Sequence, residues 1–383
     1  MSAGGPSGPA PSAETGDAVQ TYALVTGGGT GGHVYPAIAI ADELVRRGHE
    51  RASIHFVGAA RGLEARVAPA AGYSIDLLPG RGLQRSLRPR AVADNLAALW
   101  ATGRAFARAW RILGGRRPRV VVGVGGYASV PCVLAARLRR VPVVVHEQNA
   151  APGLANRVAV RLGARAAISL PGTPLRGAVL TGNPIRAEIA AIQPAPTGDR
   201  ALVGAFGGSL GARRVNDAVL DLASRWRPRD DVAIRHVSGV RDHERCAGVL
   251  ASVRTGADAL VYELVPYEEH MEQLYSHARV AVCRAGAVTV AELTAAGVPA
   301  VLVPLPGAPG DHQTRNAHTL VAAGAAVTIP DAQLDGARLA STLDGLFSEP
   351  DRLATMRAAA RSLARVDAAA RVADLAEGAA RGS

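Results

Sequence analysis

The chain has 383 residues, 48% hydrophobic and 20% charged, a composition that excludes a disordered or fibrous protein and a length that suits two α/β domains. All 43 basic residues are arginine, and the formal charge of +11 favours an acidic partner: a phosphorylated ligand, an anionic membrane or a nucleic acid. Three widely spaced cysteines fit neither a disulfide framework nor a zinc site, and we expect a reducing cytoplasm.

No stretch of the sequence predicts a membrane anchor. Residues 1–19 are rich in Pro, Gly, Ala and Ser but lack the basic start and apolar core of a signal peptide, and we expect a disordered tail there. No run approaches the ~18 apolar residues of a membrane span, so we expect any membrane contact to be peripheral.

A glycine-rich stretch organises the first half. Residues 26–36 read TGGGTGGHVYP, between an apolar run at 22–25 and a helical pattern at 37–47, which predicts a strand, a glycine loop and a helix. Such a loop brings backbone N–H groups close to an anionic ligand. The glycine spacing also satisfies the dinucleotide fingerprint, but the next strand, 53–57, ends in Gly-Ala without an acid, which argues against a nicotinamide cofactor.

Apolar runs then alternate with helical stretches, which predicts a parallel sheet with helices on both faces. We expect the strands at residues 54–57, 75–78, 120–124 and 141–146. Two clusters follow such strands: a second glycine turn at 123–131 and the polar run 146–149, His-Glu-Gln-Asn. Parallel sheets bind ligands at the carboxyl ends of their strands, so both clusters are candidate binding loops, although Glu147 and Asn149 could also simply cap the loop.

Residues 81–119 have the largest imbalance between basic and acidic residues in the chain, with ten arginines and one acid. Helical spacing over 91–113 would place part of its apolar residues in the core. The alternative is a patch for anionic lipid headgroups. Its members would be Leu83, Arg85, Leu87 and Arg88.

The second half repeats the opening pattern. After an exposed connection at 193–198, a strand at 201–206 leads into Gly-Gly-Ser-Leu-Gly at 207–211 and then a helix. The chain therefore predicts two Rossmann-like units whose loops face one another across a cleft. We place an N-terminal domain at 20–190, a C-terminal domain at 191–365, and a last segment, 366–383, that crosses back to the first domain. Further strands are expected at 233–237, 260–264, 280–283 and 300–303.

Glu292 follows the strand-to-helix turn 283–286, which we expect to place it near a helix start. There its carboxylate could complement the helix dipole, or it could accept both hydroxyls of a cis-diol. A Pro/Gly loop from 304 then enters a helix through polar side chains.

Taken in order, these motifs resemble the MurG family, the N-acetylglucosaminyltransferases that convert lipid I to lipid II in bacterial peptidoglycan synthesis. The resemblance runs from about residue 21 to about residue 365. Its motifs are GGTGGH at 28–33, GGY at 125–127, HEQN at 146–149, GNPIR at 182–186, GGS at 207–209, RAGA at 284–287 with Glu292, and DHQ at 311–313 with Asn316. It implies a GT-B fold: two Rossmann-like, doubly wound α/β domains around a cleft.

The resemblance also implies site residues. For the donor UDP-GlcNAc these are Thr30, Gly31, Gly32, Asn149, Arg186, Ser209, Gly211, Ala287, Glu292 and Gln313. For the acceptor they are Gly28, Gly29, Gly125, Gly126 and Tyr127. Arg186 and Ser209 would hold the diphosphate. Glu292 would take the ribose hydroxyls, the backbone near Glu268 the uracil edge, and Asn149 and Gln313 the GlcNAc hydroxyls.

The implied chemistry is inverting transfer to the C4 hydroxyl of MurNAc, which needs a base within reach of that hydroxyl. We expect His33 to be the base, with Glu147 and His146 as alternatives, although His33 could instead cap the helix or orient substrate. No Asp-x-Asp motif occurs, so we expect no metal and no cofactor, and Arg186 with backbone N–H groups would stabilise the leaving diphosphate.

Two positions depart from the family pattern: Leu210 stands where Gln is frequent, and Glu268 where an apolar residue is. The implied partners are UDP-GlcNAc, lipid I and an anionic membrane surface at the cytoplasmic face of the cell membrane, with room for other cell-wall synthesis proteins and no nucleic acid. Two alternatives remain: another GT-B enzyme, such as a UDP-GlcNAc 2-epimerase or a soluble-acceptor transferase, and a basic, non-catalytic membrane-binding protein.

Overall fold

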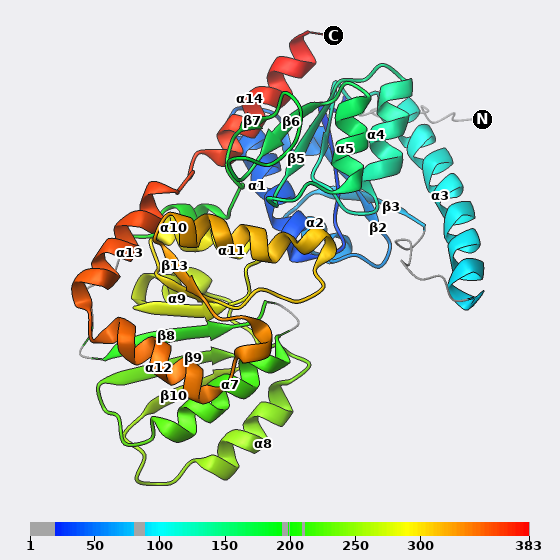
Figure 1. The fold of residues 1–383 in the computed structure, drawn as a ribbon. Helices are drawn as coiled ribbons and strands as arrows, with labels where there is room; N and C mark the ends of the chain where they lie inside the picture. Colours follow the sequence, from blue (N-terminus) through cyan, green and yellow to red (C-terminus); the bar gives the residue numbers. More distant parts are fainter. Residues whose placement is uncertain (1–19, 80–88, 194–197, 199, 209–210, 383) are drawn as a thin grey trace, which may run out of the picture.

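Two parallel β-sheets, each covered by helices on both faces, make up the molecule (Figure 1). The computed structural model describes residues 20–79, 89–193, 198, 200–208 and 211–382. The predicted membrane-patch residues Leu83, Arg85, Leu87 and Arg88 lie outside these ranges, as do Ser209 and Leu210. The expected fold of two Rossmann-like domains is confirmed.

The first sheet has seven strands in the order β3-β2-β1-β4-β5-β6-β7. They are β1 (Ala23–Thr26), β2 (Ile54–Ala59), β3 (Ser74–Leu78), β4 (Val120–Gly123), β5 (Val143–Glu147), β6 (Arg165–Ile168) and β7 (Val179–Leu180). The helices of this part are α1 (Gly31–Arg46), α2 (Glu64–Ala70), α3 (Pro89–Arg116), α4 (Ser129–Leu138) and α5 (Leu154–Arg161).

The second sheet has six strands in the order β10-β9-β8-β11-β12-β13. They are β8 (Ala201–Phe206), β9 (Val232–Val237), β10 (Val261–Val265), β11 (Val280–Cys283), β12 (Ala300–Leu302) and β13 (Ala326–Thr328). The remaining helices are α6 (Ala187–Ala190), α7 (Arg213–Arg225), α8 (His243–Val253), α9 (Met271–His277), α10 (Ala287–Ala296), α11 (His312–Ala322), α12 (Gly336–Phe347), α13 (Pro350–Ser362) and α14 (Ala368–Arg381).

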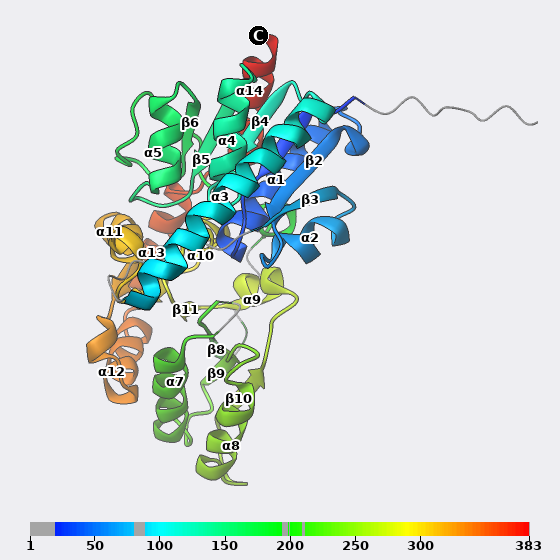
Figure 2. The same cartoon turned by 90° about the vertical axis from the view of Figure 1, so that its right-hand side faces the viewer.

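Burial on both faces explains why the strands are continuous apolar runs rather than alternating ones. In β1, Ala23 and Val25 join the core beneath α1 and α14, whereas Leu24 joins the core on the opposite face, beneath α3 and α4. Figure 2 shows α3, α4 and α5 together on that opposite face. The sheet interior is therefore dry on both sides, and polar ligand groups can reach it only at the strand ends.

Strand order reverses between β1 and β4 in the first sheet and between β8 and β11 in the second. At such a switch point the two connecting loops diverge to opposite faces and leave a crevice beyond the carboxyl ends of the strands. The predicted glycine loops follow β1, β4 and β8, and the turn before Glu292 follows β11. Both switch points are thus occupied by predicted site residues.

The structure corrects three expectations. Helix α1 begins at Gly31, six residues before the predicted pattern, so Gly31 and Gly32 lie in its first turn rather than in a loop. The sequence misled here because Pro36 favours a helix start, whereas the structure accommodates it in the second turn of α1. Glu292 lies in the middle of α10. The strands β6, β7 and β13 were not predicted, because β6 (Arg-Ala-Ala-Ile) and β13 (Ala-Val-Thr) mix alanine with a polar residue and β7 has only two residues.

The chain passes between the domains twice, and the two passages touch. The final helix α14 packs on α1, β4 and β5 of the first domain, burying Val372 and Ala376 in the core beneath α1. The first passage contains Gly182, whose φ is +88° and whose missing Cβ would collide with the Cβ of Arg365 in the second passage. Glycine is therefore required at 182 both for its backbone angle and for space.

We predict that Gly182→Ala destabilises the protein more than Gly172→Ala does. Both glycines have positive φ, +88° and +76°, but nothing lies within 4 Å of a Cβ at Gly172. Gly172→Ala should therefore cost about 1 kcal/mol of backbone strain, and Gly182→Ala that amount plus about 1–3 kcal/mol of overpacking. Urea unfolding of both variants measures the difference. Equal losses would contradict close packing of the two passages.

Candidate active site

The two glycine loops of the first domain touch each other at its switch point. The backbone N–H of Gly28 donates to the carbonyl oxygen of Gly125, 3.2 Å away. Gly126 has a φ of +84°, and a Cβ there would collide with the backbone of Gly28. The structure thus brings together four of the predicted acceptor residues. The fifth, Tyr127, is partly buried, and its hydroxyl donates to Pro79 O at 3.4 Å.

Sequence reasoning missed a buried carboxylate behind the first glycine loop. Glu64, the first residue of α2, is 1% exposed, and its two oxygens each accept a backbone N–H at 2.7 Å, from Gly29 and from Ala59. A Cβ at Gly28 would collide with this carboxylate. Glu64 therefore sets the loop conformation and requires glycine at 28. The sequence feature that could have pointed to Glu64 is an acidic residue at a helix start, five residues after a strand.

His33 lies in the first turn of α1, partly buried between the two glycine loops. Its Nδ1 is 3.4 Å from Oγ1 of Thr30, and its ring is close enough to Gly125 that a Cβ there would lie 3.1 Å from Nε2. Burial lowers the pKa of His33, His312 lowers it further, and the charge of Glu147 opposes the shift. The imidazole is therefore neutral at pH 7, the form that can accept a proton.

The two alternative bases have their polar atoms occupied. Glu147 accepts hydrogen bonds from Asn149 N, Gly153 N and Asn156 Nδ2 at 2.8–3.1 Å, and it is 3% exposed. These bonds shape the β5–α5 loop, the role that the capping interpretation gave to Glu147.

His146 is completely buried. Its Nε2 donates to the carbonyl oxygen of Gly182 at 2.9 Å, and its Nδ1 accepts from Gln148 Nε2 at 3.1 Å. Burial lowers the pKa of His146 to about 4. Both ring nitrogens are therefore committed within the fold, which leaves His33 as the stronger candidate base.

Arg186 and Glu292 face each other where the linker meets the second domain. Nη2 of Arg186 lies 3.3 Å from Oε1 of Glu292, and the Tyr275 hydroxyl donates to Oε2 at 3.0 Å. Burial raises the pKa of Glu292, whereas the charge of Arg186 opposes that shift. These partners and the mid-helix position argue against a helix-dipole role for this carboxylate. Within the described part of the chain, Nε of Arg186 is buried without a hydrogen-bond partner.

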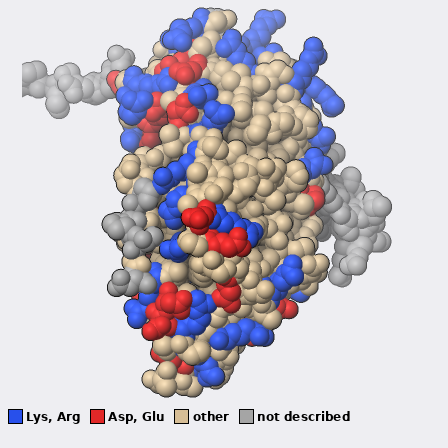
Figure 3. Space-filling view, turned by 60° about the vertical axis from the view of Figure 1, so that its left-hand side comes forward, with Lys and Arg blue, Asp and Glu red and all other residues tan. Residues whose placement is uncertain are grey.

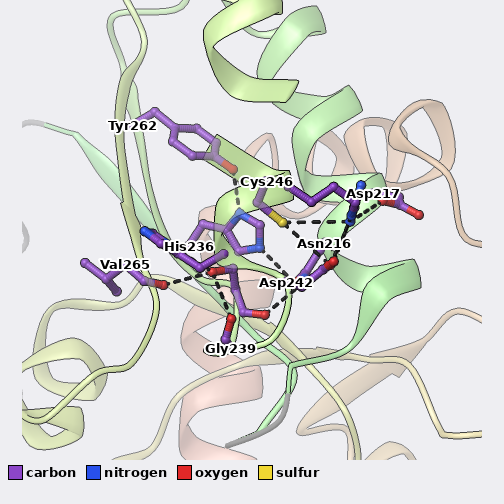
Figure 4. Close-up of polar contacts among 11 residues, drawn as sticks. Asn216, Asp217, His236, Gly239, Asp242, Cys246, Tyr262 and Val265 are labelled. Atoms are coloured by element: carbon purple, nitrogen blue, oxygen red, sulfur yellow. Dashed lines mark hydrogen bonds and ion pairs between the residues drawn. The ribbon is translucent and has the colours of Figure 1, made fainter. Parts of the chain in front are cut away.

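A buried polar network lies behind Gly211, the last residue of the glycine motif in the second domain (Figure 4 shows the network). Asn216 in α7 donates from Nδ2 to Ser238 O at 2.9 Å and to Asp242 Oδ2 at 2.8 Å. Gly211 packs directly on Ser238: its φ is +77°, and a Cβ there would collide with Ser238 O. The network therefore fixes the surface on which the loop lies, just before α7 begins at Arg213.

His236 completes this network. Because Asn216 uses Nδ2 for Ser238 and Asp242, its Oδ1 accepts from Nε2 of His236 at 3.0 Å. The other nitrogen, Nδ1, then accepts from the Tyr262 hydroxyl at 2.7 Å. Burial lowers the pKa of His236 to about 4, so the ring stays neutral and both bonds persist at pH 7.

The domains meet in front of these loops. The Tyr35 hydroxyl of α1 lies 3.5 Å from that of Tyr267 in the second domain, and Asn149 bonds to Asn316 of α11 at 3.2 Å. Gln313, at the start of α11, accepts the backbone N–H of Leu305 at 2.9 Å. Ala287 is the first residue of α10. The two interdomain contacts therefore place the predicted donor residue Asn149 directly against the second domain.

Glu268, one of the two departures, is bonded to Arg235 in the second domain, with Oε2 2.9 Å from Nη2. Its Oε1 accepts the backbone N–H of His270 at 3.1 Å. Its carboxylate is therefore occupied.

Among the described residues, no group of three or more His, Cys, Asp or Glu side chains could hold a metal ion. Across the same residues, the helices are too short or too polar to span a membrane.

Comparison with known proteins identifies the family. The Glycosyltransferase family 28 N-terminal domain matches residues 23–168, and the Glycosyltransferase family 28 C-terminal domain matches residues 202–375. The UDP-N-acetylglucosamine–N-acetylmuramyl-(pentapeptide) pyrophosphoryl-undecaprenol N-acetylglucosamine transferase of Methylococcus capsulatus is 43% identical over 355 residues, which is 91% of this chain and 96% of the relative. The chain belongs to this family of transferases.

Solved structures agree with this assignment. MurG of Acinetobacter baumannii matches with a TM-score of 0.71 and 30% identity, over 94% of this chain and 99% of that one. A UDP-N-acetylglucosamine 2-epimerase from Listeria monocytogenes has a TM-score of 0.63 at 14% identity, over 92% and 95% of the two chains. At that identity the epimerase shares the fold alone. The resemblance to the MurG family and the expectation of a glycosyltransferase are confirmed.

We predict that His146 and His236 make stability fall on acidification. Both are neutral in the folded state with a pKa of about 4, against about 6.5 when unfolded, so the unfolded chain binds more protons between these values. The contribution of each histidine to the free energy of unfolding is therefore fully present above pH 6.5. It falls as the pH drops towards 4, by up to about 3 kcal/mol for each histidine. Urea unfolding from pH 7 to pH 4.5 measures this slope. A His236→Gln variant with the slope of the unaltered protein would contradict the assignment.

Proposed function

We propose that this chain transfers GlcNAc from UDP-GlcNAc to the C4 hydroxyl of MurNAc in lipid I, with inversion, and so forms lipid II. The observation that carries the proposal is the likeness to curated transferases along more than nine-tenths of the chain, because the name of these transferases states both donor and acceptor. The epimerase alternative rests on a likeness at 14% identity, which supports the fold alone.

Inversion requires a direct attack in which the acceptor hydroxyl bonds to the anomeric carbon while the bond to UDP breaks. The hydroxyl proton must pass to a nearby base, and we assign that role to His33. Its support is the position of His33 between the glycine loops that follow β1 and β4, together with a pKa lowered by burial. Thr30, 3.4 Å from Nδ1, would orient the ring.

The departing diphosphate gains negative charge, which must be stabilised as it forms. Arg186 supports this role because its Nε is buried without a partner in the described structure, so an anionic oxygen would satisfy it. The N–H groups at the start of α7, after Gly211, would add the partial positive charge of a helix N-terminus, which favours an anionic diphosphate. We assign Ser209 to the same diphosphate from its place in the motif. Glu292 would release Arg186 and accept the ribose hydroxyls instead.

The remaining assignments follow the domains. Asn149 of the first domain and Gln313 of the second would hold the GlcNAc hydroxyls, together with Ala287. The glycine loops around Gly28 and Gly126 would receive the acceptor. We expect no metal or other cofactor, because the proposed arginine and N–H groups supply the positive charge that a metal would otherwise bring.

We also propose that the first domain docks peripherally on anionic membrane at the cytoplasmic face. Support comes from exposed leucines among arginines: Leu138 ends α4, Leu154 begins α5 and Leu162 follows it, at 67%, 62% and 41% exposure. Exposed Arg157 and Arg161 lie on α5 between the last two. On the face in Figure 3, by contrast, arginines lie beside acidic side chains in several places.

We predict that His33→Ala abolishes transfer while leaving donor binding intact. Loss of a general base typically lowers kcat about 10²–10⁴-fold, and the rate of the unaltered enzyme should fall as pH drops through the lowered pKa of His33. The assay supplies UDP-GlcNAc, a lipid I analogue and a chelator, and follows UDP and the disaccharide product. Unchanged turnover of the variant would remove the base assignment. Donor binding without turnover by the unaltered protein would overturn the transferase proposal.

We predict that replacing Leu83 and Leu87 together with Ser weakens binding to anionic liposomes about 10-fold or more, since each leucine contributes up to about 1.5–3 kcal/mol of apolar burial. The matched control is Val240→Ser, because Val240 is 68% exposed in the second domain. Liposome sedimentation at fixed salt measures the effect. Full retention by the double variant would count against the patch.

A further inference from the structure

One asparagine joins three segments of the chain beside the candidate site. Asn316, in α11, is completely buried. Its Oδ1 accepts the backbone N–H of Ala150 at 3.0 Å, and its Nδ2 donates to Asn149 Oδ1 at 3.2 Å and to the carbonyl oxygen of Ala285 at 3.1 Å. Asn149 and Ala150 belong to the first domain, whereas Ala285 lies in the β11–α10 turn of the second. The side chain is thus a hydrogen-bonded connection between the domains.

These partners determine which way both amides point. A backbone N–H can only donate and a carbonyl oxygen can only accept, so Oδ1 of Asn316 must face Ala150 and Nδ2 must face Ala285. Asn149 therefore turns its Oδ1 toward Asn316. Its Nδ2 lies on the other side, 3.5 Å from Glu147 Oε1, too long for a strong bond. The N–H groups on Nδ2 are therefore the part of the Asn149 side chain that can bind a ligand.

The rest of the loop is already fixed from behind. The carboxylate of Glu147 accepts the N–H groups of Asn149 and Gly153, and Thr173 Oγ1 lies 3.4 Å from the carbonyl oxygen of Asn149. Among the described residues of its own domain, the side-chain amide of Asn149 makes no hydrogen bond as short as these. Its orientation is thus supplied from the second domain, by Asn316.

Asn316 also places a second predicted sugar contact. Gln313 precedes it by three residues in α11, so the two side chains lie on neighbouring positions of one helix face. When Asn316 bonds to Asn149 and Ala150, Gln313 is held at a set position relative to Asn149 although the two come from different domains. Loss of the Asn316 side chain would loosen this relation without touching the groups assigned to the diphosphate.

We propose that Asn316 is a positioning residue for the donor sugar: it orients the Asn149 amide and holds it in register with Gln313 across the domain boundary. The inference rests on the proposed function, since it assumes that both side chains meet the GlcNAc of UDP-GlcNAc. It predicts that Asn316 matters for the sugar and not for the nucleotide.

The test compares UDP with UDP-GlcNAc. In isothermal titration, Asn316→Ala should weaken UDP-GlcNAc binding on the order of 10-fold and leave UDP binding unchanged, because a buried amide contact is lost only on the sugar side. Asn149→Ala should show the same pattern, and the double variant should lose no more than either single one. Equal weakening of UDP and UDP-GlcNAc, or additive losses in the double variant, would overturn the proposal.

The matched control is Leu320→Ala, which removes a buried side chain one turn further along α11 that packs in the second domain's core. It should lower Tm yet leave the ratio of the two affinities unchanged. A second readout needs no ligand: exchange of the Ala150 amide hydrogen should accelerate in Asn316→Ala and not in Leu320→Ala.

This design separates the two claims. An unaltered protein that binds UDP-GlcNAc but does not turn over with a lipid I analogue refutes the proposed function, and the affinity ratios still decide the role of Asn316. An unaltered protein that binds UDP and UDP-GlcNAc equally well overturns the positioning proposal by itself.

Discussion

The ion pair between Arg186 and Glu292 is the interaction around which the candidate site is built. An unpaired carboxylate at Glu292 would cost several kcal/mol, because Glu292 is 6% exposed and lies against Tyr275. The pair keeps a guanidinium from the linker against the second domain, and the same guanidinium lies 5.4 Å from the ring centroid of Tyr35 in α1. One charged contact therefore sits where the linker and both domains meet.

The site is also the product of one topology used twice. In each sheet the strand order reverses beside the strand that carries a glycine loop, so the loops open into crevices at the strand ends. Buried polar groups lie behind the described parts of these loops: Glu64 accepts the N–H of Gly29 in the first domain, and in the second Gly211 packs on Ser238, whose carbonyl oxygen accepts from Asn216. Fully paired polar groups of this kind rigidify a loop without blocking its ligand face.

Much of the fold could be predicted from the sequence, because strands buried on both faces are continuous apolar runs and their ends carry glycine. The start of α1 could not, since Pro36 suggests a later start and only tertiary packing draws Gly31 and Gly32 into the helix. The strands β6 and β13 could not be predicted either, because they mix alanine with a polar residue instead of forming an apolar run, and β7 has only two residues.

Some residues of the candidate site could likewise be predicted from the sequence, and others could not. The family resemblance implies His33, Arg186 and Glu292 as site residues. It could not find Glu64 or the role of Asn316, whose partners are backbone groups 35 and 166 residues away. The sequence also could not show whether Glu147 shapes its loop or acts as a base. The answer depends on which backbone and side-chain N–H groups surround its carboxylate in the fold.

A crystal structure of the protein with UDP-GlcNAc would test the central claim most directly, namely that the donor takes over the partners of the Arg186–Glu292 pair. The account predicts that the two side chains separate, with Arg186 on the diphosphate and Glu292 on the ribose hydroxyls. A donor bound elsewhere, or bound here with the ion pair intact, would contradict it.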